Sequence, residues 1–501
     1  MNGPARPGES MRLPADFQIV LDPGVRRLDE GRVLLGGSPL RMVRLRTASA
    51  VRELACLERG EAVGAGARSV LARRLLDAGL AQPRPGHGEP AAGGGLTVVI
   101  PVRDRPVALR RCLAALARDP ACDEVLVVDD ASERPELTAK AAAQYGARVL
   151  RRDRQGGPAA ARNTGLRRCR TPLVAFVDSD CVPGPGWLDA LLPHFRDPAV
   201  AAVAPRITGL PGPGGPLVAY EACRSSLDLG PAEGRVAPGT RISYVPSAAL
   251  LVRREAAGGG FDEELDVGED VDFVWRVHRA GWTVRYEPGA TVAHDHRVRF
   301  GPWLGRRFAY GTSAAPLALR HPGDVPPVAV SVWSAAAWVL LAAGRPAAAL
   351  ALTTGTSVLL SRKLAVEKGA LPAAARLAGL GTLYAGRNLA SGMTRAWWPV
   401  SAALAVRSRP VRRALIAAVV GQAVDDWVRL RPGLDPVRFL AARTLDDAAY
   451  GAGLWWGALR SGSVQALLPD LSSRPRSRTK RHPARTKRLS EAPSAEPRRG
   501  G

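Results

Sequence analysis

PLVAFVDSD, residues 172–180, joins a short apolar run to two closely spaced carboxylates. A continuous apolar run of this length predicts a strand that is buried on both faces. The same pattern occurs three times upstream, and each run leads into a helical pattern: TVVIPV (97–102), EVLVVDD (124–130) and ARVLR (147–151). Strands that alternate with helices predict an α/β fold with a mainly parallel sheet.

Acidic residues stand at the ends of two of these predicted strands. Asp129 and Asp130 end one strand, and Asp178 and Asp180 end another. Ligands of open α/β sheets bind at the carboxyl ends of the strands, so a site is predicted at this edge. Asp178 and Asp180 lie two residues apart, and on an extended backbone their side chains leave the same face. Such a pair suits a hard divalent cation, and a plain polar turn is the alternative.

Four motifs follow one another along the central part of the chain: VVDDAS (127–132), GGPAAARNTG (156–165), FVDSD (176–180) and GGFDEELDVGED (259–270). In this order and spacing they resemble the family 2 glycosyltransferases of GT-A fold, over about residues 96–320. The resemblance implies an inverting transfer of a sugar from a nucleotide-sugar donor to an acceptor hydroxyl. It also implies a divalent metal, Mn or Mg, that neutralises the leaving diphosphate.

The same resemblance implies which residues bind the donor. The end of the first strand lies beside the nucleotide, and an aspartate that ends the second strand accepts a hydrogen bond from the uracil ring. The glycine-rich segment opens a helix whose N-terminus favours an anion, and its Arg-Asn-x-Gly element lines the donor pocket. The donor-binding residues expected on this basis are Pro101, Arg103, Asp130, Gly157, Arg162, Asn163 and Asp178.

Metal ligands and a catalytic base follow in the same way. The resemblance implies Asp180 as the most direct metal ligand, together with Asp178 and His294. An acceptor hydroxyl is a poor nucleophile at neutral pH, so a carboxylate must take its proton. The resemblance assigns this role to Asp270, and Glu269 then positions the base or the acceptor. The alternative for both acids is that they only complement a helix dipole.

Composition narrows the partners and the compartment. The formal net charge is +24, but no RNP, zinc-finger or helix-turn-helix signature accompanies it, so nucleic acid is not expected as a partner. The six cysteines form no C-x-x-C pair, which suits free thiols in a reducing compartment. The first residues contain no apolar run of the kind found in a signal peptide. The predicted location is the cytoplasm or the cytoplasmic side of the cell membrane.

The regions that flank the central one are predicted from composition and periodicity. Residues 325–344 and 346–361 are uncharged, which favours either a helical bundle or a membrane hairpin or span. The basic C-terminal tail suits an anionic membrane surface, with a solubilising tail as the alternative. The predicted parts are a disordered N-terminus (1–12), a small winged-helix-like module (13–83), a linker (84–95), the GT-A region (96–320), an Ala-rich helical region (321–470) and a disordered basic tail (471–501).

A narrower resemblance rests on the N-terminal segment RLPADFQIVLDPGVRRLDEGRVLLGGSPLRMVRL (12–45), linked to the central region and the Ala-rich helices. Up to about residue 470 the chain is similar to the glycosyltransferases of mycofactocin biosynthesis. This implies UDP-glucose as donor and, as acceptor, the peptide-derived redox molecule premycofactocin or a related small molecule. It also implies a short chain of β-linked glucose. The N-terminal module is similar to small peptide-binding winged-helix domains.

One departure from the wider family limits the product. Processive polysaccharide synthases of this family carry a Gln-x-x-Arg-Trp element after the base, whereas residues 300–313 of this chain are FGPWLGRRFAYGTS. Limited addition is therefore expected, with Arg306 and Arg307 either contacting the diphosphate or standing as surface charges. Two other functions stay open at this point. One is transfer, for example of rhamnose, to a lipid-linked or cell-wall glycan, and the other is a membrane-tethered module that binds nucleotide sugar without catalysis.

Overall fold

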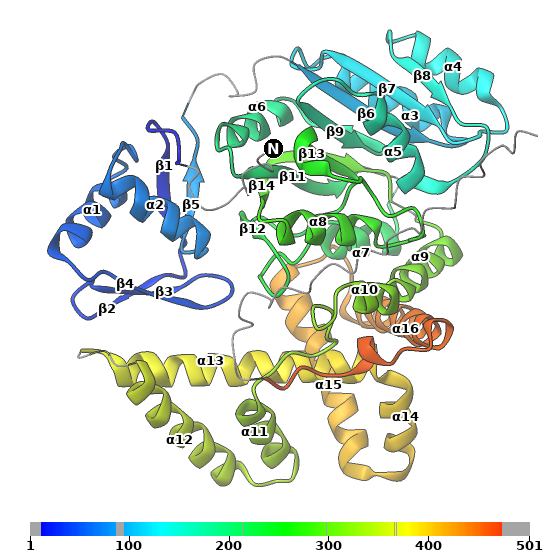
Figure 1. Cartoon of the computed structure of the whole chain (residues 1–501). Coiled ribbons are helices and arrows are strands. Elements are labelled where there is room, and N and C mark those ends of the chain that lie inside the picture. The colour runs from blue at the N-terminus through cyan, green and yellow to red at the C-terminus, as the bar shows by residue number, and fades with distance from the viewer. Residues whose placement is uncertain are drawn as a thin grey trace, which may run out of the picture.

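The computed structural model describes residues 12–86, 95–212, 214–296, 298–364, 366 and 368–472, and these form three consecutive parts (Figure 1). Nearly all of the predicted disordered tail (471–501) and of the predicted disordered N-terminus (1–12) lies outside the described residues. Most of the predicted linker lies outside them as well.

The N-terminal part packs two helices against short strands. Its elements are β1 (Gln18–Leu21), β2 (Arg26–Leu28), β3 (Val33–Gly36), β4 (Arg41–Arg44), α1 (Ala48–Glu58), α2 (Ala67–Asp77) and β5 (Ala81–Arg84). β1 pairs with β5, and β2, β3 and β4 form a separate antiparallel sheet. Thr47 caps α1 by accepting a hydrogen bond from the amide of Ala50 at 3.1 Å. Leu34, Leu54 and Leu75 fill the core between helices and strands.

The central part contains a nine-stranded sheet among the described residues. Its order is β10-β14-β11-β13-β9-β6-β7-β8, and β12 pairs with β14. The strands are β6 (Leu96–Val102), β7 (Glu124–Asp129), β8 (Arg148–Arg151), β9 (Leu173–Val177), β10 (Cys181–Pro183), β11 (Val200–Gly209), β12 (Gly234–Val236), β13 (Ala249–Arg253) and β14 (Thr283–His294). The parallel core predicted from the apolar runs is β9-β6-β7-β8. Antiparallel pairings of β13 with β9 and β11, and of β10 with β14, make the whole sheet mixed.

Helices cover both faces of this sheet, as the continuous apolar strands predict (Figure 1). Val98 and Ile100 of β6 pack with the residues of one cluster, whereas Val99 packs with another, because neighbouring side chains of a strand point to opposite faces. The first cluster takes its helical residues from α3 (Pro106–Leu116), α4 (Pro135–Ala143) and α6 (Trp187–Leu191), and the second from α5 (Gly157–Arg168) and α8 (Glu269–Arg279). This α/β architecture is the GT-A-like class expected from the sequence.

The C-terminal part is helical and lies on one side of the sheet domain (Figure 1). Its helices are α9 (Phe300–Thr312), α10 (Ala314–Arg320), α11 (Val332–Ala342), α12 (Pro346–Leu364), α13 (Ala370–Ser391), a π-helical turn (Gly392–Ala396), α14 (Trp398–Arg407), α15 (Arg409–Leu430) and α16 (Pro436–Ser461). α16 packs against α9 at very short range. A Cβ on Gly453 would lie 1.9 Å from the carbonyl oxygen of Phe308, so no larger residue fits there. Tyr220, from α7 (Pro216–Arg224), adds a buried hydrogen bond to Asp446 of α16 at 2.9 Å.

The two uncharged segments of the sequence fall on α11 and α12, which are separate helices joined by a turn at Gly344 and Arg345. The two helices form a hairpin (Figure 1), and α11 covers only 11 of residues 325–344, so the predicted alternative of a single membrane span there is wrong. Within the described part of the chain, no helix combines the length and the apolar character that crossing a membrane requires.

Candidate active site

The carboxyl end of β9 carries the two aspartates that the sequence singled out. The backbone turns directly after the strand, where the amide of Cys181 donates to the carbonyl of Asp178 at 2.9 Å. β10 then pairs antiparallel with β14, so that Cys181 lies opposite His294. This pairing brings the carboxylate of Asp180 to 3.6 Å from Nε2 of His294. Arg105, just beyond β6, donates a hydrogen bond to the same carboxylate.

Arg162 of α5 connects two predicted site residues. Its side chain is almost fully buried, with Nη2 2.6 Å from Oδ1 of Asp178 and Nη1 2.9 Å from Oε1 of Glu269. The guanidinium also lies over the ring of Phe261, 5.4 Å from its centroid. A buried charge needs such partners, because its transfer from water is costly. Arg162 therefore holds the end of β9 and the start of α8 in fixed relation.

Asp270 stands in the first turn of α8, beside this ion pair. The helix begins after Gly268, whose φ of +90° lies in the region that favours glycine. The amide of Ser247 donates to Oδ2 of Asp270 at 3.3 Å. Burial, with a smaller effect of the Glu269 charge, raises the pKa of Asp270 to about 7. A carboxylate with this pKa can take a proton from a substrate hydroxyl at neutral pH.

Asp130 has a structural task that the sequence did not reveal. Its buried carboxylate accepts the amides of Gly156 at 3.0 Å and Gly157 at 2.8 Å. Arg152 pairs with it at 3.2 Å. Asp130 thereby attaches the end of β7 to the N-terminus of α5, which keeps the glycine-rich segment beside the strand ends.

The side chain of Asn163, which was predicted to line the donor pocket, binds the loop that precedes α8. Its amide nitrogen donates to the carbonyl of Phe261 and to Glu263, both at 2.8 Å, and its oxygen accepts the amide of Phe261 at 2.8 Å. These bonds fix the loop before α8.

The two predicted donor-binding residues of the first strand have different surroundings. Pro101 pairs with Val128 inside the sheet, whereas Arg103 lies beyond the strand with a side chain that is 40% exposed.

A cleft opens next to Asp180 and His294. It is lined by Asp180, Glu221, Ser225, Ser226, Leu227, His294, His296, Trp303, Arg306, Arg307 and Tyr310. Several of these were not predicted as site residues, because α7, which carries Glu221, has no recognisable motif. Arg105, which binds Asp180, was not predicted as a site residue either. Its position just after the first strand was the signal in the sequence that could have indicated it.

The two arginines of α9 play different parts in this cleft. Arg307 is buried and bound to Glu221, and its Nε lies 3.3 Å from Asp446. The alternative that Arg307 is only a surface charge is therefore wrong. Arg306 is exposed and lies over the ring of Tyr310, 5.0 Å from its centroid. Arg306 is therefore the arginine of this pair that an incoming anion can reach.

His296 is a buried member of the cleft rather than a surface histidine. Its side chain is 9% exposed and its Nδ1 is 3.8 Å from Glu221. Burial, His294 and Arg307 lower the pKa of His296 to about 4, so the ring is neutral at neutral pH. It adds no positive charge next to Asp180.

The three predicted metal ligands do not form one cluster. Asp178 faces Arg162, away from the contact between Asp180 and His294. In the part of the chain that the structure describes, no three His, Cys, Asp or Glu side chains are grouped so that they could hold a metal ion. Asp180 and His294 are nevertheless donors of the right chemistry for a divalent cation that takes its other ligands from a diphosphate.

Comparison with known proteins identifies the family. The chain is 44% identical, over 475 residues, to the pre-mycofactocin glycosyltransferase of Mycobacterium tuberculosis, in two strains. The alignment spans 92% of this chain and 99% of that enzyme, and residues 97–257 match the model of glycosyl transferase family 2. The chain belongs to glycosyl transferase family 2. As a family 2 member it is a nucleotide-sugar-dependent glycosyltransferase, as the motifs predicted.

Other glycosyltransferases align with only part of the chain. Glycosyltransferase AglE of Haloferax volcanii is 27% identical over 226 residues, which cover 43% of this chain and 71% of AglE. Among solved structures, the mannosyltransferase PcManGT of Pyrobaculum calidifontis, in complex with GDP-Man and Mn²⁺, is 20% identical. The superposition covers 70% of this chain and 91% of the mannosyltransferase chain, with a TM-score of 0.36.

Proposed function

We propose that this chain transfers glucose from UDP-glucose, with inversion, to a hydroxyl of premycofactocin, and that it builds a short chain of β-linked glucose. The proposal is supported by 44% identity along nearly the whole length of enzymes that bear the pre-mycofactocin name. The observation that carries the chemistry is the position of Asp270, a partly buried carboxylate with a raised pKa, beside the ion pair of Arg162 and Glu269.

The donor binds, in this proposal, along the carboxyl ends of β6, β7 and β9. Pro101, Arg103 and the segment around Asp130 and Gly157 flank the nucleotide, and the exposed carboxylate edge of Asp178 faces the ribose. The N-terminus of α5 adds a partial positive charge near the phosphates. Asn163 acts here through the loop it holds and not by direct contact.

Asp180 and His294 are the residues that would hold Mn²⁺ or Mg²⁺. When bound, this ion neutralises negative charge that develops on the diphosphate. Arg105, which donates to Asp180, and Arg306, which is exposed in the cleft, add positive charge from the protein itself. The site thus favours a doubly charged leaving group over a neutral one.

Transfer is a single displacement in this scheme. The acceptor oxygen attacks C1 of glucose while its proton passes to the carboxylate of Asp270. The bond between C1 and the diphosphate oxygen breaks, UDP leaves with the bonding electrons, and the configuration at C1 changes from α to β. Glu269, fixed by Arg162, positions the first turn of α8 and therefore Asp270.

We place this reaction in the cytoplasm, at the cytoplasmic face of an anionic membrane. The six cysteines are free thiols in the structure, which is compatible with a reducing compartment. The basic tail of residues 471–501 supports contact with anionic lipid, although its structure lies outside the described residues.

The test is a transfer assay with purified full-length protein, Mn²⁺, UDP-glucose and premycofactocin, followed by mass spectrometry. Products that carry a few added hexoses, released as glucose by a β-glucosidase, are expected. Parallel reactions replace UDP-glucose by GDP-mannose or by a dTDP-rhamnose donor, and premycofactocin by a lipid-linked glycan. Faster transfer to the lipid-linked acceptor would overturn the proposed substrate while leaving the enzyme class intact.

A further inference from the structure

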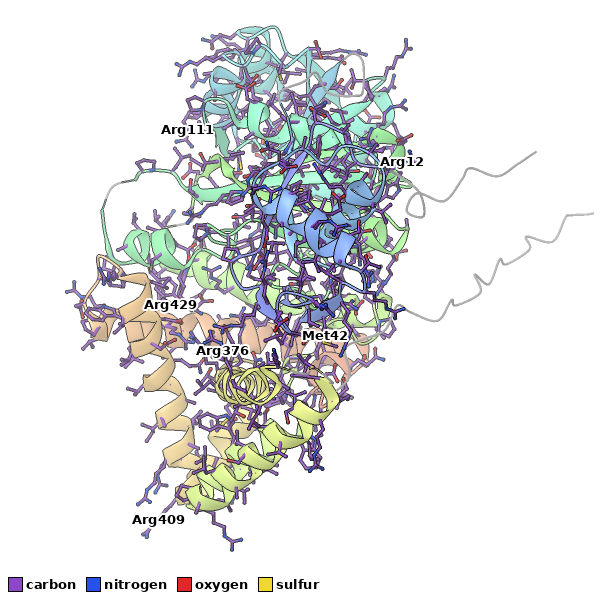
Figure 2. All side chains as sticks on the ribbon, turned by 90° about the vertical axis from the view of Figure 1, so that its left-hand side faces the viewer. Arg12, Met42, Arg111, Arg376, Arg409 and Arg429 are labelled. Atoms are coloured by element: carbon purple, nitrogen blue, oxygen red, sulfur yellow. The ribbon has the colours of Figure 1, made fainter. Side chains whose placement is uncertain are left out.

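The helical region presents apolar side chains to solvent on two hairpins. One hairpin is α11–α12 and the other is α14–α15, and both project away from the sheet domain (Figures 1 and 2). Large aliphatic side chains that are 40 to 78% exposed stand on all four helices: Val339, Leu341, Leu350, Leu404, Val406 and Ile416. A monomeric soluble protein rarely leaves so many grouped apolar side chains uncovered, so the surface needs a partner.

The charge of the same segment is strongly one-sided. Residues 325–424 contain eleven arginines and lysines but a single acidic residue, Glu367. Arg409, at the tip of the α14–α15 hairpin, lies far from the sheet domain in Figure 2, and Arg407, Arg412 and Arg413 are its neighbours in sequence. The tip of the other hairpin carries Arg345.

The acidic residues of α15 stand at its opposite end, and each pairs with an arginine of another helix, although Asp425 itself is exposed. Asp426 is buried and accepts Arg224 of α7 at 2.5 Å, and Asp425 pairs with Arg387 of α13. Arg387 and Arg395 are paired with acidic residues in this way, whereas the arginines near the hairpin tip are exposed: Arg407, Arg409, Arg412 and Arg413.

From these observations we infer that the two hairpins form an anionic-lipid docking surface that enters one leaflet only. The exposed aliphatic side chains reach the boundary between headgroups and acyl chains, and the long arginine side chains extend back to lipid phosphates. The inference deepens the membrane location proposed above and rests on it.

Helix length agrees with shallow insertion. α11 and α14 have 11 and 10 residues, so each is about 15 Å long at the rise of an α-helix, roughly half of a bilayer core of about 30 Å. No described helix is able to cross the bilayer. The other arms, α12 and α15, have 19 and 22 residues but lack the apolar character that crossing a membrane requires. Both hairpins are therefore suited to the interface and leave the sheet domain in water.

A second copy of the chain fits this surface less well. Two identical surfaces brought face to face would place their arginines together, and the segment offers almost no carboxylate to compensate them. An anionic lipid headgroup supplies that compensation and the adjoining apolar phase at once.

The test measures flotation of the full-length protein with vesicles of phosphatidylcholine alone or of equal parts phosphatidylcholine and phosphatidylglycerol. Binding to the anionic vesicles only is expected. The apolar pair Leu350→Ser/Val406→Ser should lower the partition coefficient on the order of tenfold, because buried aliphatic area is lost. Val70→Ser, on α2, removes an equally exposed aliphatic side chain elsewhere and should leave binding unchanged.

A charge pair completes the design. Arg409→Ala/Arg413→Ala should lower binding by roughly tenfold or more, whereas Arg110→Ala/Arg118→Ala, both exposed near α3, should change it little. The apolar pair leaves net charge unchanged, so it separates the hairpins from the basic tail. If that pair binds like wild type, or if it instead abolishes a concentration-dependent dimer seen by light scattering, the inference is wrong.

Hydrolysis of UDP-glucose in solution, measured on the same samples, keeps this inference separate from the proposed function. Normal hydrolysis with no vesicle binding contradicts the docking surface alone. Vesicle binding with no activity on any donor contradicts the proposed function and leaves the surface in place. Circular dichroism spectra that match wild type show that each variant is folded.

Discussion

Arg162 and Glu269 form a buried ion pair in which Nη1 lies 2.9 Å from Oε1, although 107 positions separate the two residues in sequence. Glu269 directly precedes the proposed base, and Arg162 also binds Asp178 at the end of β9. One guanidinium thus joins the proposed donor side of the site to the proposed acceptor side. Changes at this pair are expected to alter stability and proton transfer together.

Replacement of Asp270 by Asn should remove the proton acceptor while preserving shape. We expect kcat to fall by about 10²–10⁴-fold, the usual contribution of general base catalysis. Affinity for UDP in the presence of Mn²⁺, measured by calorimetry, should stay unchanged. A large loss of UDP affinity would instead assign Asp270 to the donor site.

The pH dependence of transfer should follow the ionisation of Asp270. Because its folded-state pKa is raised to about 7, the carboxylate is protonated and inactive below that pH, and the rate should rise as pH increases through about 7. Glu269→Gln removes the neighbouring negative charge and leaves Arg162 free to attract Asp270, so the rising limb should move to lower pH. Profiles of kcat for both proteins provide the measurement, and a shift to higher pH would contradict this electrostatic relationship.

Loss of Arg162 should destabilise the fold. Arg162→Met leaves the carboxylates of Asp178 and Glu269 without their cation, and removal of one partner from a buried ion pair costs about 3 kcal/mol or more. Denaturant unfolding measures this loss. The double variant Arg162→Met/Glu269→Gln should recover part of it, because one of the uncompensated charges is then absent.

Asp180→Ala should weaken UDP binding only when the metal is present. The variant loses a carboxylate donor next to His294 but keeps the nucleotide side of the site. Calorimetric titrations with UDP, with and without Mn²⁺, should therefore converge to the metal-free affinity of wild type. Unchanged metal-dependent binding would remove Asp180 from the ligand set.

Local pattern was sufficient for the parallel half of the sheet. β6, β7 and β9 are continuous apolar runs, and each ends within three residues of the predicted position. The sequence did not predict that β11 and β13 pair in antiparallel fashion. The direction of pairing depends on contacts between segments that lie far apart in the chain. The same limit applies to α11 and α12, whose uncharged sequences favoured a helical bundle or a membrane hairpin or span without deciding between them.

Of the candidate site, too, the sequence predicted some features and not others. The sequence located Asp178, Asp180 and Asp270, because they end strands or begin a helix within recognisable motifs. It did not indicate that Arg162 binds both Asp178 and Glu269, or that Asn163 binds the loop at Phe261. The contacts of Arg162 with Glu269 and of Asn163 with Phe261 join residues 107 and 98 positions apart, and composition or periodicity holds no information about them.

The close packing of α16 on α9 has a consequence for modularity. Gly453 leaves no space between the two helices, and Tyr220 and Arg307 take hydrogen-bonding and ionic partners from α16. A chain cut after Arg320 would expose these groups and remove Asp446, the partner of the cleft residue Arg307. The region from α11 to α16 therefore cannot be replaced by an unrelated domain without loss of contacts that the rest of the fold uses. The family model ends at residue 257, but these contacts lead us to expect that a stable catalytic unit extends to α16.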